Sequence, residues 1–283
     1  MIKFLAVDMD GTCLDPLSRF SKTTLEALYK AKAAGIEIVP TTGRALACLP
    51  HTLKEHPDLF RYVISSNGAL VKDTKTQKEL FRTRIPPYLI EELVHRFKKE
   101  RVFAAAHIGS EYWVNGKMMQ MQGRLVFGKD ARETIISNDL FADLLKNKNY
   151  VEEIQLYFLG RRQKERVRAL LSDLHELHAA FTPAYVEIFD KESSKGKALK
   201  KLAGHLGIEK DEIACIGDGE NDVFMFEVAG SSFAMGNAEQ AVKEKAAYVT
   251  RSNRENGVAC AIERILTTLS KKSSTTTGGD ELR

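Results

Sequence analysis

Two aspartates, Asp8 and Asp10, stand one residue apart at the end of the first apolar stretch of the chain. Two close carboxylates resist being ionised together, so such a pair needs a cation, a shared proton or exposure to water. In an extended strand residues i and i+2 face the same side, so both carboxylates would point into one site. The pair is therefore a candidate for metal binding or acid–base chemistry.

Two further acidic residues, Asp218 and Asp222, belong to the glycine-rich stretch GDGEND at 217–222. Up to four carboxylates in one pocket are costly unless a hard cation neutralises them. Magnesium prefers one or two carboxylates together with waters and phosphate oxygens, and these residues offer that ligand set. The acidic residues therefore predict a Mg²⁺ site.

Other residues suit the binding of a phosphate group. Thr42 and Gly43 offer a hydroxyl and an unobstructed backbone N–H beside a helix predicted to begin near Arg44, which makes an anion cradle. Lys195, at the start of another predicted helix, can supply a point positive charge. The tight turn of the GDGEND stretch brings Asn221 to the same place. A metal, a phosphate cradle and a spare carboxylate together indicate phosphoryl chemistry.

A parallel sheet would bring these residues together. Short β-branched runs alternate with longer amphipathic stretches at both ends of the chain, which is typical of an α/β fold. The predicted strands that matter here are 3–7, 37–41, 62–65 and 212–216. In such sheets ligands bind beyond the carboxyl ends of the strands, and Asp8, Thr42 and Asp218 all closely follow strands.

The alternation changes between residues 85 and 189, where helices are interspersed with antiparallel strand candidates. We therefore predict a discontinuous catalytic core, 1–84 and 190–270, with an inserted α+β domain over 85–189. Residues 271–283 are polar and of low complexity, and we predict a disordered tail there.

Four short motifs, in order, resemble those of the haloacid dehalogenase superfamily: DMDGT (8–12), TTGR (41–44), SKG (194–196) and GDGEND (217–222). Three further segments, SNGA (66–69), AMGNA (234–238) and NGVA (256–259), are similar to those of Cof-type phosphatases of subfamily IIB. In that family a large α/β cap lies between the second and third motifs. The resemblance covers almost the whole chain except the tail, and it implies a Rossmann-like core with an inserted cap domain.

The resemblance implies a chemical role for each matching acidic residue. Asp8 would attack phosphorus to give an aspartyl-phosphate, and Asp10 would protonate the departing alkoxide and then activate the hydrolytic water. Mg²⁺ would be held by Asp8, Asp218 and the backbone carbonyl of Asp10. The metal would keep Asp8 ionised and leave the side chain of Asp10 free to carry a proton.

The resemblance also implies which residues bind the transferring phosphoryl group. They are Thr42, Gly43, Lys195 and Asn221. Asp222 would orient Lys195 or a metal-bound water, although it serves equally well as a helix N-cap.

Several assignments stay open at this point. Thr41 precedes Thr42, and adjacency to Gly43 favours Thr42 as the phosphate ligand. Asn67 ends a strand on the same edge, where it would either contact the substrate or form a turn. In the inserted domain, the candidates for contacting the leaving group, which are more often surface or core residues of a hairpin, are His107, Glu111, Trp113, Asn115 and Arg124.

The predicted function is a Mg²⁺-dependent phosphatase for small soluble phosphomonoesters, with sugar phosphates foremost, beneath a mobile cap that excludes water. The nearest alternative is a phosphomutase of the phosphomannomutase type. A non-hydrolytic phosphate-responsive regulator is a third reading, but receiver domains are roughly half this length.

The composition of the chain limits which classes of partner and which cellular compartment are expected. The 283 residues carry 42 Lys and Arg against 38 Asp and Glu, and this balance of +4 is spread along the chain, which does not predict a nucleic-acid partner. The four cysteines lie far apart without metal-finger spacing, which favours a reducing compartment and hence the cytoplasm. Neither a signal peptide nor a membrane partner is expected. The expected partner is a small phosphate ester, and the oligomeric state is not predicted.

Overall fold

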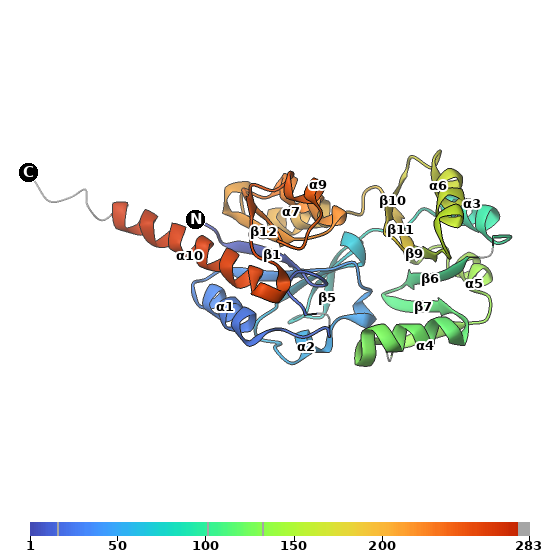
Figure 1. The fold of residues 1–283 in the computed structure, drawn as a ribbon, viewed down its shortest axis with the longest axis horizontal. Helices are drawn as coiled ribbons and strands as arrows, with labels where there is room; N and C mark the ends of the chain where they lie inside the picture. Colours follow the sequence, from blue (N-terminus) through green and yellow to red (C-terminus); the bar gives the residue numbers. More distant parts are fainter. Residues whose placement is uncertain (16, 101, 132, 277–283) are drawn as a thin grey trace, which may run out of the picture.

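The computed structural model describes residues 1–15, 17–100, 102–131 and 133–276. These residues form an eight-stranded sheet and a six-stranded sheet, which we call the core sheet and the cap sheet. The two sheets lie next to each other along the long axis of the molecule (Figure 1). Strands of the core sheet come from both ends of the chain and strands of the cap sheet come from its middle, so the α/β fold with an inserted unit is confirmed. The domain boundaries stay a prediction, which this division supports.

The core sheet has the strand order β14-β13-β12-β1-β2-β3-β4-β5. The strands from β14 to β3 are parallel, and β4 and β5 add antiparallel pairs at one edge. The strands are β1 (Phe4–Asp8), β2 (Glu37–Thr41), β3 (Tyr62–Ser65), β4 (Leu70–Asp73), β5 (Lys78–Arg82), β12 (Ile213–Gly217), β13 (Ser231–Ala234) and β14 (Tyr248–Val249).

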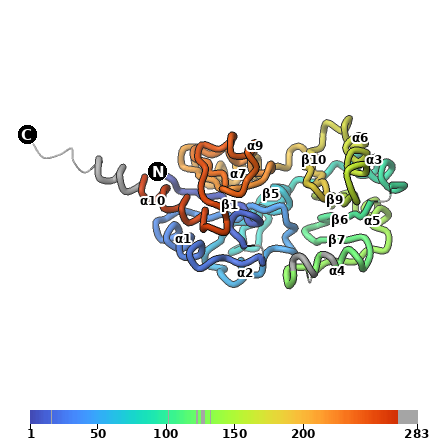
Figure 2. Tube along the Cα trace, viewed as in Figure 1, coloured from blue at the N-terminus to red at the C-terminus, as the bar shows by residue number. Residues whose placement is uncertain are grey.

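Helices cover both faces of the core sheet because successive residues of a strand face opposite sides. Leu5 and Val7 of β1 pack in one hydrophobic cluster with α1 and α10, whereas Phe4 and Ala6 pack in another with α7 and α8. The helices are α1 (Lys22–Ala33), α2 (His51–Lys54), α7 (Lys195–His205), α8 (Val223–Val228), α9 (Gln240–Lys243) and α10 (Gly257–Thr276). The trace in Figure 2 shows α10 and the N-terminus at the end of the molecule far from the cap sheet.

The cap sheet has the strand order β10-β11-β9-β6-β7-β8, and its strands are antiparallel except for the β7–β8 pair. Helices α3, α5 and α6 pack on one face in a single apolar cluster, while Met119 of α4 packs on the other face. The elements are α3 (Pro87–Phe97), β6 (Phe103–Ile108), β7 (Glu111–Asn115), α4 (Gly116–Phe127), β8 (Thr134–Ser137), α5 (Leu140–Lys146), β9 (Val151–Tyr157), α6 (Arg161–Leu171), β10 (Leu177–Phe181) and β11 (Tyr185–Asp190).

The segment after Gly43 differs from the prediction of a helix that begins near Arg44. A short 3₁₀ turn, η1 (Leu46–Cys48), comes first, and α2 begins only at His51 with Pro50 as its N-cap. A proline disfavours the helical conformation of the residue before it, so a helix cannot run through this segment. Thr42 and Gly43 therefore lack the helix dipole that was expected beside them.

The C-terminal helix also differs from expectation, because α10 runs to Thr276 and so enters the predicted disordered tail, 271–283. The sequence contains no glycine or proline between Gly257 and Gly278, so nothing in that stretch forces the helix to end. Residues 277–283 of the predicted tail lie outside the described part of the chain. Among the described helices, none is both long enough and apolar enough to cross a membrane.

Candidate active site

The residues predicted to do chemistry gather at the carboxyl edge of the core sheet. Asp8 is the last residue of β1, and Thr41, Ser65 and Gly217 end the strands β2, β3 and β12. Parallel neighbours end at the same edge of a sheet, so the loops that follow them meet there. This edge faces a cavity of about 640 Å³ whose lining comes from both the core and the cap sheet regions.

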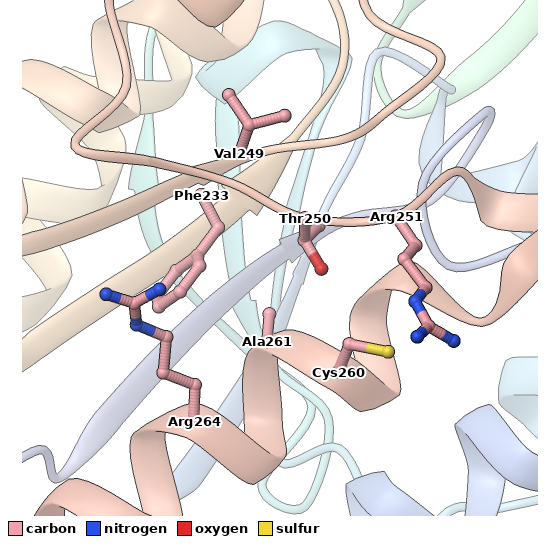
Figure 3. Close-up of a pocket in the computed structure, with 7 residues that line it drawn as sticks. All are labelled: Phe233, Val249, Thr250, Arg251, Cys260, Ala261 and Arg264. Carbon is pink, nitrogen blue, oxygen red and sulfur yellow. The ribbon is translucent and has the colours of Figure 1, made fainter.

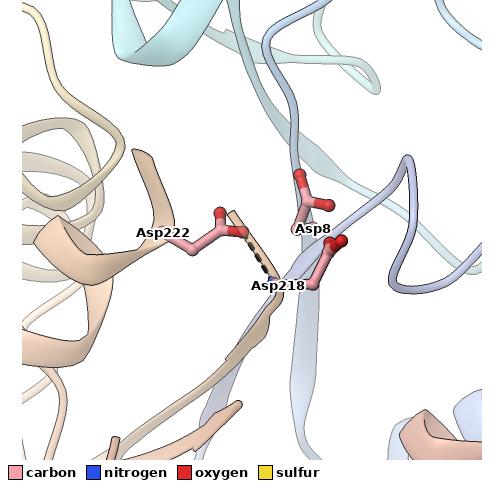
Figure 4. A group of neighbouring side chains, drawn as sticks. All are labelled: Asp8, Asp218 and Asp222. Carbon is pink, nitrogen blue, oxygen red and sulfur yellow. Dashed lines mark hydrogen bonds between the residues drawn. The ribbon is translucent and has the colours of Figure 1, made fainter. Parts of the chain in front are cut away.

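Three of the predicted acidic residues form one cluster, namely Asp8, Asp218 and Asp222 (Figure 4). One carboxylate oxygen from each lies within 4.8 Å of the others. Asp218 accepts a hydrogen bond from Thr12 Oγ1 at 2.6 Å, and Asp222 Oδ2 accepts from the backbone N–H of Asp218 at 2.9 Å. Gly11 adopts a φ of +82°, and a Cβ there would lie 2.4 Å from the carboxylate of Asp218, so only glycine fits this turn.

Lys195 is the cation of this cluster. Its ammonium lies 2.6 Å from Asp8 Oδ1 and 2.7 Å from Asp222 Oδ1, and its side chain is 1% exposed. The residue opens α7, where Ser194 caps the helix by accepting a hydrogen bond from Lys197 N. Burial alone would lower the pKa of Lys195, but Asp222 and Asp8 together raise it, so the ammonium stays charged.

Two carboxylates of the cluster, those of Asp8 and Asp218, resist ionisation. Burial, and then the charge of Asp222, raises the pKa of Asp8, although Lys195 opposes the shift. The same two causes raise the pKa of Asp218 to about 6. Three carboxylates beside one ammonium leave negative charge uncompensated, and oxygen ligands at this spacing suit a hard divalent cation. The cluster therefore fits the Mg²⁺ that the sequence predicts.

Asp222 does not cap α8, because its side chain makes no hydrogen bond to that helix; it caps only the short 3₁₀ turn η5 (Glu220–Asp222), by accepting from the backbone N–H of Gly219. The same carboxylate bonds Lys195 and the backbone N–H groups of Asp218 and Gly219. Of its two predicted uses, the contacts favour the orientation of Lys195.

Asp10 lies apart from the acidic cluster. Its carboxylate is 47% exposed and forms a two-pronged ion pair with Arg44, at 2.7 Å from Nε and 2.5 Å from Nη2. The side chain of Asp10 is thus directed to the guanidinium, and metal binding by its backbone carbonyl stays a prediction.

The Thr42–Gly43 turn lies on the cavity wall, whereas Thr41 is not among the described residues that line the cavity. Thr41 is fully buried and donates its hydroxyl to Val39 O. The backbone N–H of Thr42 is bonded to Ile64 O, so what Thr42 offers a phosphate is its hydroxyl. A Cβ on Gly43 would lie 3.2 Å from Asn67 Oδ1, which explains the need for a small residue.

Asn67 supports the site from beneath and is not among the described residues on the cavity wall. It is fully buried, adopts a left-handed φ of 51°, and so takes the turn role rather than the substrate contact. Its Oδ1 accepts a hydrogen bond from Asn221 at 2.8 Å, and its Nδ2 donates to Glu153 and Glu187, each at 2.8 Å. Asn67 therefore connects Asn221, which does line the cavity, to two carboxylates of the cap sheet.

The cap sheet contributes an aromatic wall to the cavity. Tyr157 and Tyr185 have ring centroids 5.1 Å apart, and the hydroxyls of Tyr112 and Tyr157 each lie 3.0 Å from Gln155 Oε1. Of the cap candidates named from the sequence, His107 lines the cavity, whereas Glu111, Trp113, Asn115 and Arg124 are not among its described lining residues.

Several lining residues were missed in the sequence, among them Arg44, Asp130, Tyr185 and Glu187. Arg44 stands inside the TTGR motif, and that position was the available signal. Nothing local distinguishes Tyr185 and Glu187 from other residues of an alternating strand. A second cavity, of about 330 Å³, is formed by residues of β13, β14, the segment after β14 and α10 (Figure 3), and it contains none of the predicted site residues.

The burial of His107, on the cap side of the cavity, lowers its pKa, and the effect on stability can be tested. His107 is fully buried, its Nδ1 lies 3.0 Å from Ser66 Oγ, and burial lowers its pKa to about 3 from 6.5. Glu153, at 3.9 Å, does not hold a proton on it, because burial and then Glu187 raise the pKa of Glu153 itself. Folded His107 is therefore neutral.

Because unfolding lets His107 take up a proton, its contribution to stability is fully present above pH 6.5 and is lost as the pH falls toward 3. We expect His107→Gln to reduce the loss of unfolding free energy between pH 7 and pH 5 by about 2 kcal/mol. Urea titrations at the two pH values measure this. His175→Gln, at an exposed position, should leave the loss unchanged, and an equal pH dependence in wild type and His107→Gln would contradict the prediction.

Comparisons with known proteins identify the family of the chain. The family model of haloacid dehalogenase-like hydrolases matches residues 5–262. The chain is 31% identical to a Bacillus subtilis (strain 168) protein named 5-amino-6-(5-phospho-D-ribitylamino)uracil phosphatase YwtE, over 94% of this chain and 98% of that protein.

Solved structures show the same fold. A haloacid dehalogenase-like hydrolase from B. subtilis superposes with a TM-score of 0.82 at 27% identity, over 93% of this chain and 99% of that one. The subclass IIB sugar phosphatase BT4131 superposes with a TM-score of 0.80 at 25% identity, over 93% of this chain and 98% of that one.

Proposed function

The chain belongs to the haloacid dehalogenase-like hydrolases as a Cof-type phosphatase, and we propose that it hydrolyses small phosphorylated metabolites, foremost sugar phosphates, with Mg²⁺. One observation carries the proposal. The buried carboxylate of Asp8 is bound to Lys195, belongs to an acidic cluster, and opens on a cavity that is lined by the cap sheet.

Asp8 and Asp10 carry the two bond-making steps in this proposal. An oxygen of Asp8 attacks phosphorus, the bond from phosphorus to the ester oxygen breaks, and Asp10 gives its proton to the departing alkoxide. A water then attacks the phosphorus of the aspartyl-phosphate, Asp10 takes its proton, and inorganic phosphate leaves with Asp8 restored. Each step conserves charge and atoms, and Asp10 ends as it began.

The phosphate-binding residues act by charge and position. Lys195 and Thr42 line the cavity and would bind the oxygens of the transferring group, together with Gly43 and Asn221. Asp8, Asp218 and the backbone carbonyl of Asp10 would hold Mg²⁺, and the metal would neutralise charge on the phosphoryl oxygens when bound. Preorganised charges in a site that excludes water stabilise a transition state strongly, because they do not have to reorient.

The substrate class is supported by the cavity and by two of the similar proteins. A volume of about 640 Å³ suits a small ligand enclosed between two sheets. BT4131 is a sugar phosphatase, and the name of YwtE describes action on a phosphorylated ribityl compound. All four cysteines are free, which supports a cytoplasmic location.

A panel of phosphorylated sugars and polyols tests the proposed function, with phosphate release measured with and without Mg²⁺. We expect turnover of several members and loss of turnover when EDTA removes the metal. Absence of release from every member, or equal release with EDTA, would contradict the proposal. Retention of the phosphoryl group on a sugar bisphosphate would instead identify a phosphomutase.

Metal binding is separately testable by thermal unfolding. Mg²⁺ should raise the Tm, because a ligand that binds only the folded state stabilises it, by about 2.7 kcal/mol at a hundred times its Kd. Asp218→Asn should remove most of this rise. Glu220→Gln is the matched control, since Glu220 belongs to the same loop but is exposed. An undiminished rise in Asp218→Asn would show that the metal binds elsewhere.

A further inference from the structure

Arg44 joins the proposed acid–base residue Asp10 to the cap side of the molecule. Its Nε and Nη2 bind the two carboxylate oxygens of Asp10, and its Nη1 lies 2.8 Å from Asp130 Oδ2. Arg44 follows β2 of the core sheet, whereas Asp130 lies in η3 (Gly128–Ala131), which follows α4 beside the cap sheet. One guanidinium thus spans the two halves of the cavity wall.

This connection is buried and geometrically determined. The side chain of Arg44 is 8% exposed and that of Asp130 is 1% exposed. The other oxygen of Asp130 accepts a hydrogen bond from the backbone N–H of His51 at 2.9 Å and lies 2.9 Å from its Nδ1. Both oxygens of Asp130 are therefore engaged with residues that follow β2, and Asp130 cannot turn without breaking a bond.

The two-pronged pair leaves Asp10 able to act. A carboxylate offers about four lone-pair positions, and the fork of an arginine uses two of them. Asp10, Arg44 and Asp130 all line the cavity, so the remaining positions on Asp10 are accessible to a bound leaving group. Without Arg44, rotation about the side-chain bonds would let this 47% exposed carboxylate sample several directions.

We propose that Arg44 is a positioning residue for Asp10 and that Asp130 holds Arg44 in place, so that contact with the cap sets the geometry of proton transfer. The inference rests on the proposed function, in which Asp10 protonates the leaving group. It makes Asp130 a residue of the cap region that controls chemistry without touching the reacting atoms. A misplacement of about 1 Å can cost about 10²-fold in rate, so such control is measurable.

If the Arg44–Asp130 ion pair only held the core and the cap together, its loss would have a different effect. It would lower the rate for every substrate of similar size to a similar extent. Loss of positioning slows those substrates whose leaving group needs a proton, because a leaving group that is stable as an anion departs without one. Dependence on the leaving group therefore separates the two roles.

The test uses p-nitrophenyl, p-chlorophenyl and phenyl phosphate, which are similar in size but increase in leaving-group basicity. We expect Arg44→Lys to lower kcat/KM for phenyl phosphate about 10²-fold, and Asp130→Asn about 10-fold. For p-nitrophenyl phosphate both losses should stay below about 3-fold, because that leaving group needs little proton transfer. Equal losses across the series, or none, would overturn the proposal.

A second arginine–aspartate pair supplies matched controls. Asp73 is 5% exposed, binds Arg61 at 3.1 Å and accepts hydrogen bonds from two backbone N–H groups. It pairs with Tyr62, which lies at the end of β3 away from the carboxyl edge of the core sheet. Arg61→Lys and Asp73→Asn should leave the leaving-group dependence unchanged. A steeper dependence in these controls would show that loss of an ion pair in general causes the effect and would overturn the proposal.

Asp10→Asn separates failure of this inference from failure of the proposed function. If Asp10→Asn leaves the dependence on the leaving group unchanged, Asp10 is not the acid and the proposed mechanism fails. If Asp10→Asn steepens it while Arg44→Lys and Asp130→Asn do not, only the positioning inference fails. Thermal unfolding verifies that each variant folds. If only one of Arg44→Lys and Asp130→Asn folds, that variant alone decides whether the positioning inference holds.

Discussion

Replacing Asp8 by asparagine is expected to lower kcat for phosphate release by about 10⁵-fold, because an amide cannot serve as the nucleophile. Asp8 is the residue of the acidic cluster that ends the central strand β1 and also contacts Lys195. We expect neither of the other two carboxylates to replace it, since Asp222 accepts hydrogen bonds from two backbone N–H groups and Asp218 accepts one from Thr12.

The measurement combines phosphate release with detection of the aspartyl-phosphate. Rapid acid quenching followed by peptide mass spectrometry should find one phosphoryl group on the peptide that contains Asp8 in wild type and none in Asp8→Asn. Asp15→Asn is the matched control, because Asp15 lies on the same stretch and binds Arg19 outside the cavity. Turnover unaffected by Asp8→Asn would contradict the proposed nucleophile.

Replacing Lys195 by alanine is expected to damage both folding and activity. The ammonium is 1% exposed and is bound to Asp8 and Asp222, so its removal leaves two carboxylates buried without their cation. Breaking a buried ion pair from one side costs about 3–5 kcal/mol. We expect the free energy of unfolding to fall by about this amount near pH 7 without metal, and kcat to fall by about 10³-fold because a charged phosphate contact is lost.

Mg²⁺ should partly restore the stability of Lys195→Ala, because a divalent cation in the acidic cluster replaces the missing positive charge. Urea unfolding with and without Mg²⁺ measures this, and the variant should gain more from the metal than wild type does. Lys197→Ala is the matched control, since Lys197 lies on the same helix but is 42% exposed and binds Glu192. A Lys195→Ala protein as stable as wild type without metal would show that the carboxylates do not need their cation.

The candidate site could be predicted from the sequence wherever local order determines position. Asp8 follows an apolar strand, and the carboxyl ends of parallel neighbours meet at one edge. The same rule places Asp218, and Lys195 is placed by the predicted start of its helix. The structure brings the carboxylates of Asp8, Asp218 and Asp222 within 4.8 Å of one another and pairs Lys195 with Asp8 and Asp222.

Predictions from local sequence were wrong where a residue further along the chain restricted the backbone. A helix near Arg44 was a reasonable expectation for a residue that follows a glycine turn, but Pro50 limits the segment to a 3₁₀ turn and a short α2. Arg44 is thereby left in a loop from which it reaches Asp10 and Asp130.

Only the tertiary structure decided which residues of the cap region face the carboxyl edge of the core sheet. In β9 the pairing with β6 shifts register, from His107 opposite Glu153 to Ile108 opposite Val151, so Glu152 has no partner residue in the ladder. Both glutamates consequently reach the segment that follows β3 of the core sheet. There Glu152 accepts a hydrogen bond from Ser66, and Glu153 accepts one from Asn67. A sequence read with period two would have placed the two glutamates on opposite faces.

The sequence by itself therefore determined the edge of the sheet at which the candidate site lies and the types of residue that form it, because strand and helix periods are local properties. The tertiary structure decided the contacts of Arg44 with Asp130 and of Asn67 with Glu153, which join residues 86 positions apart in the chain. Such contacts depend on how the part of the chain around the core sheet and the part around the cap sheet are placed against each other. No periodicity within either sheet encodes that packing, so these residues emerged only from the structure.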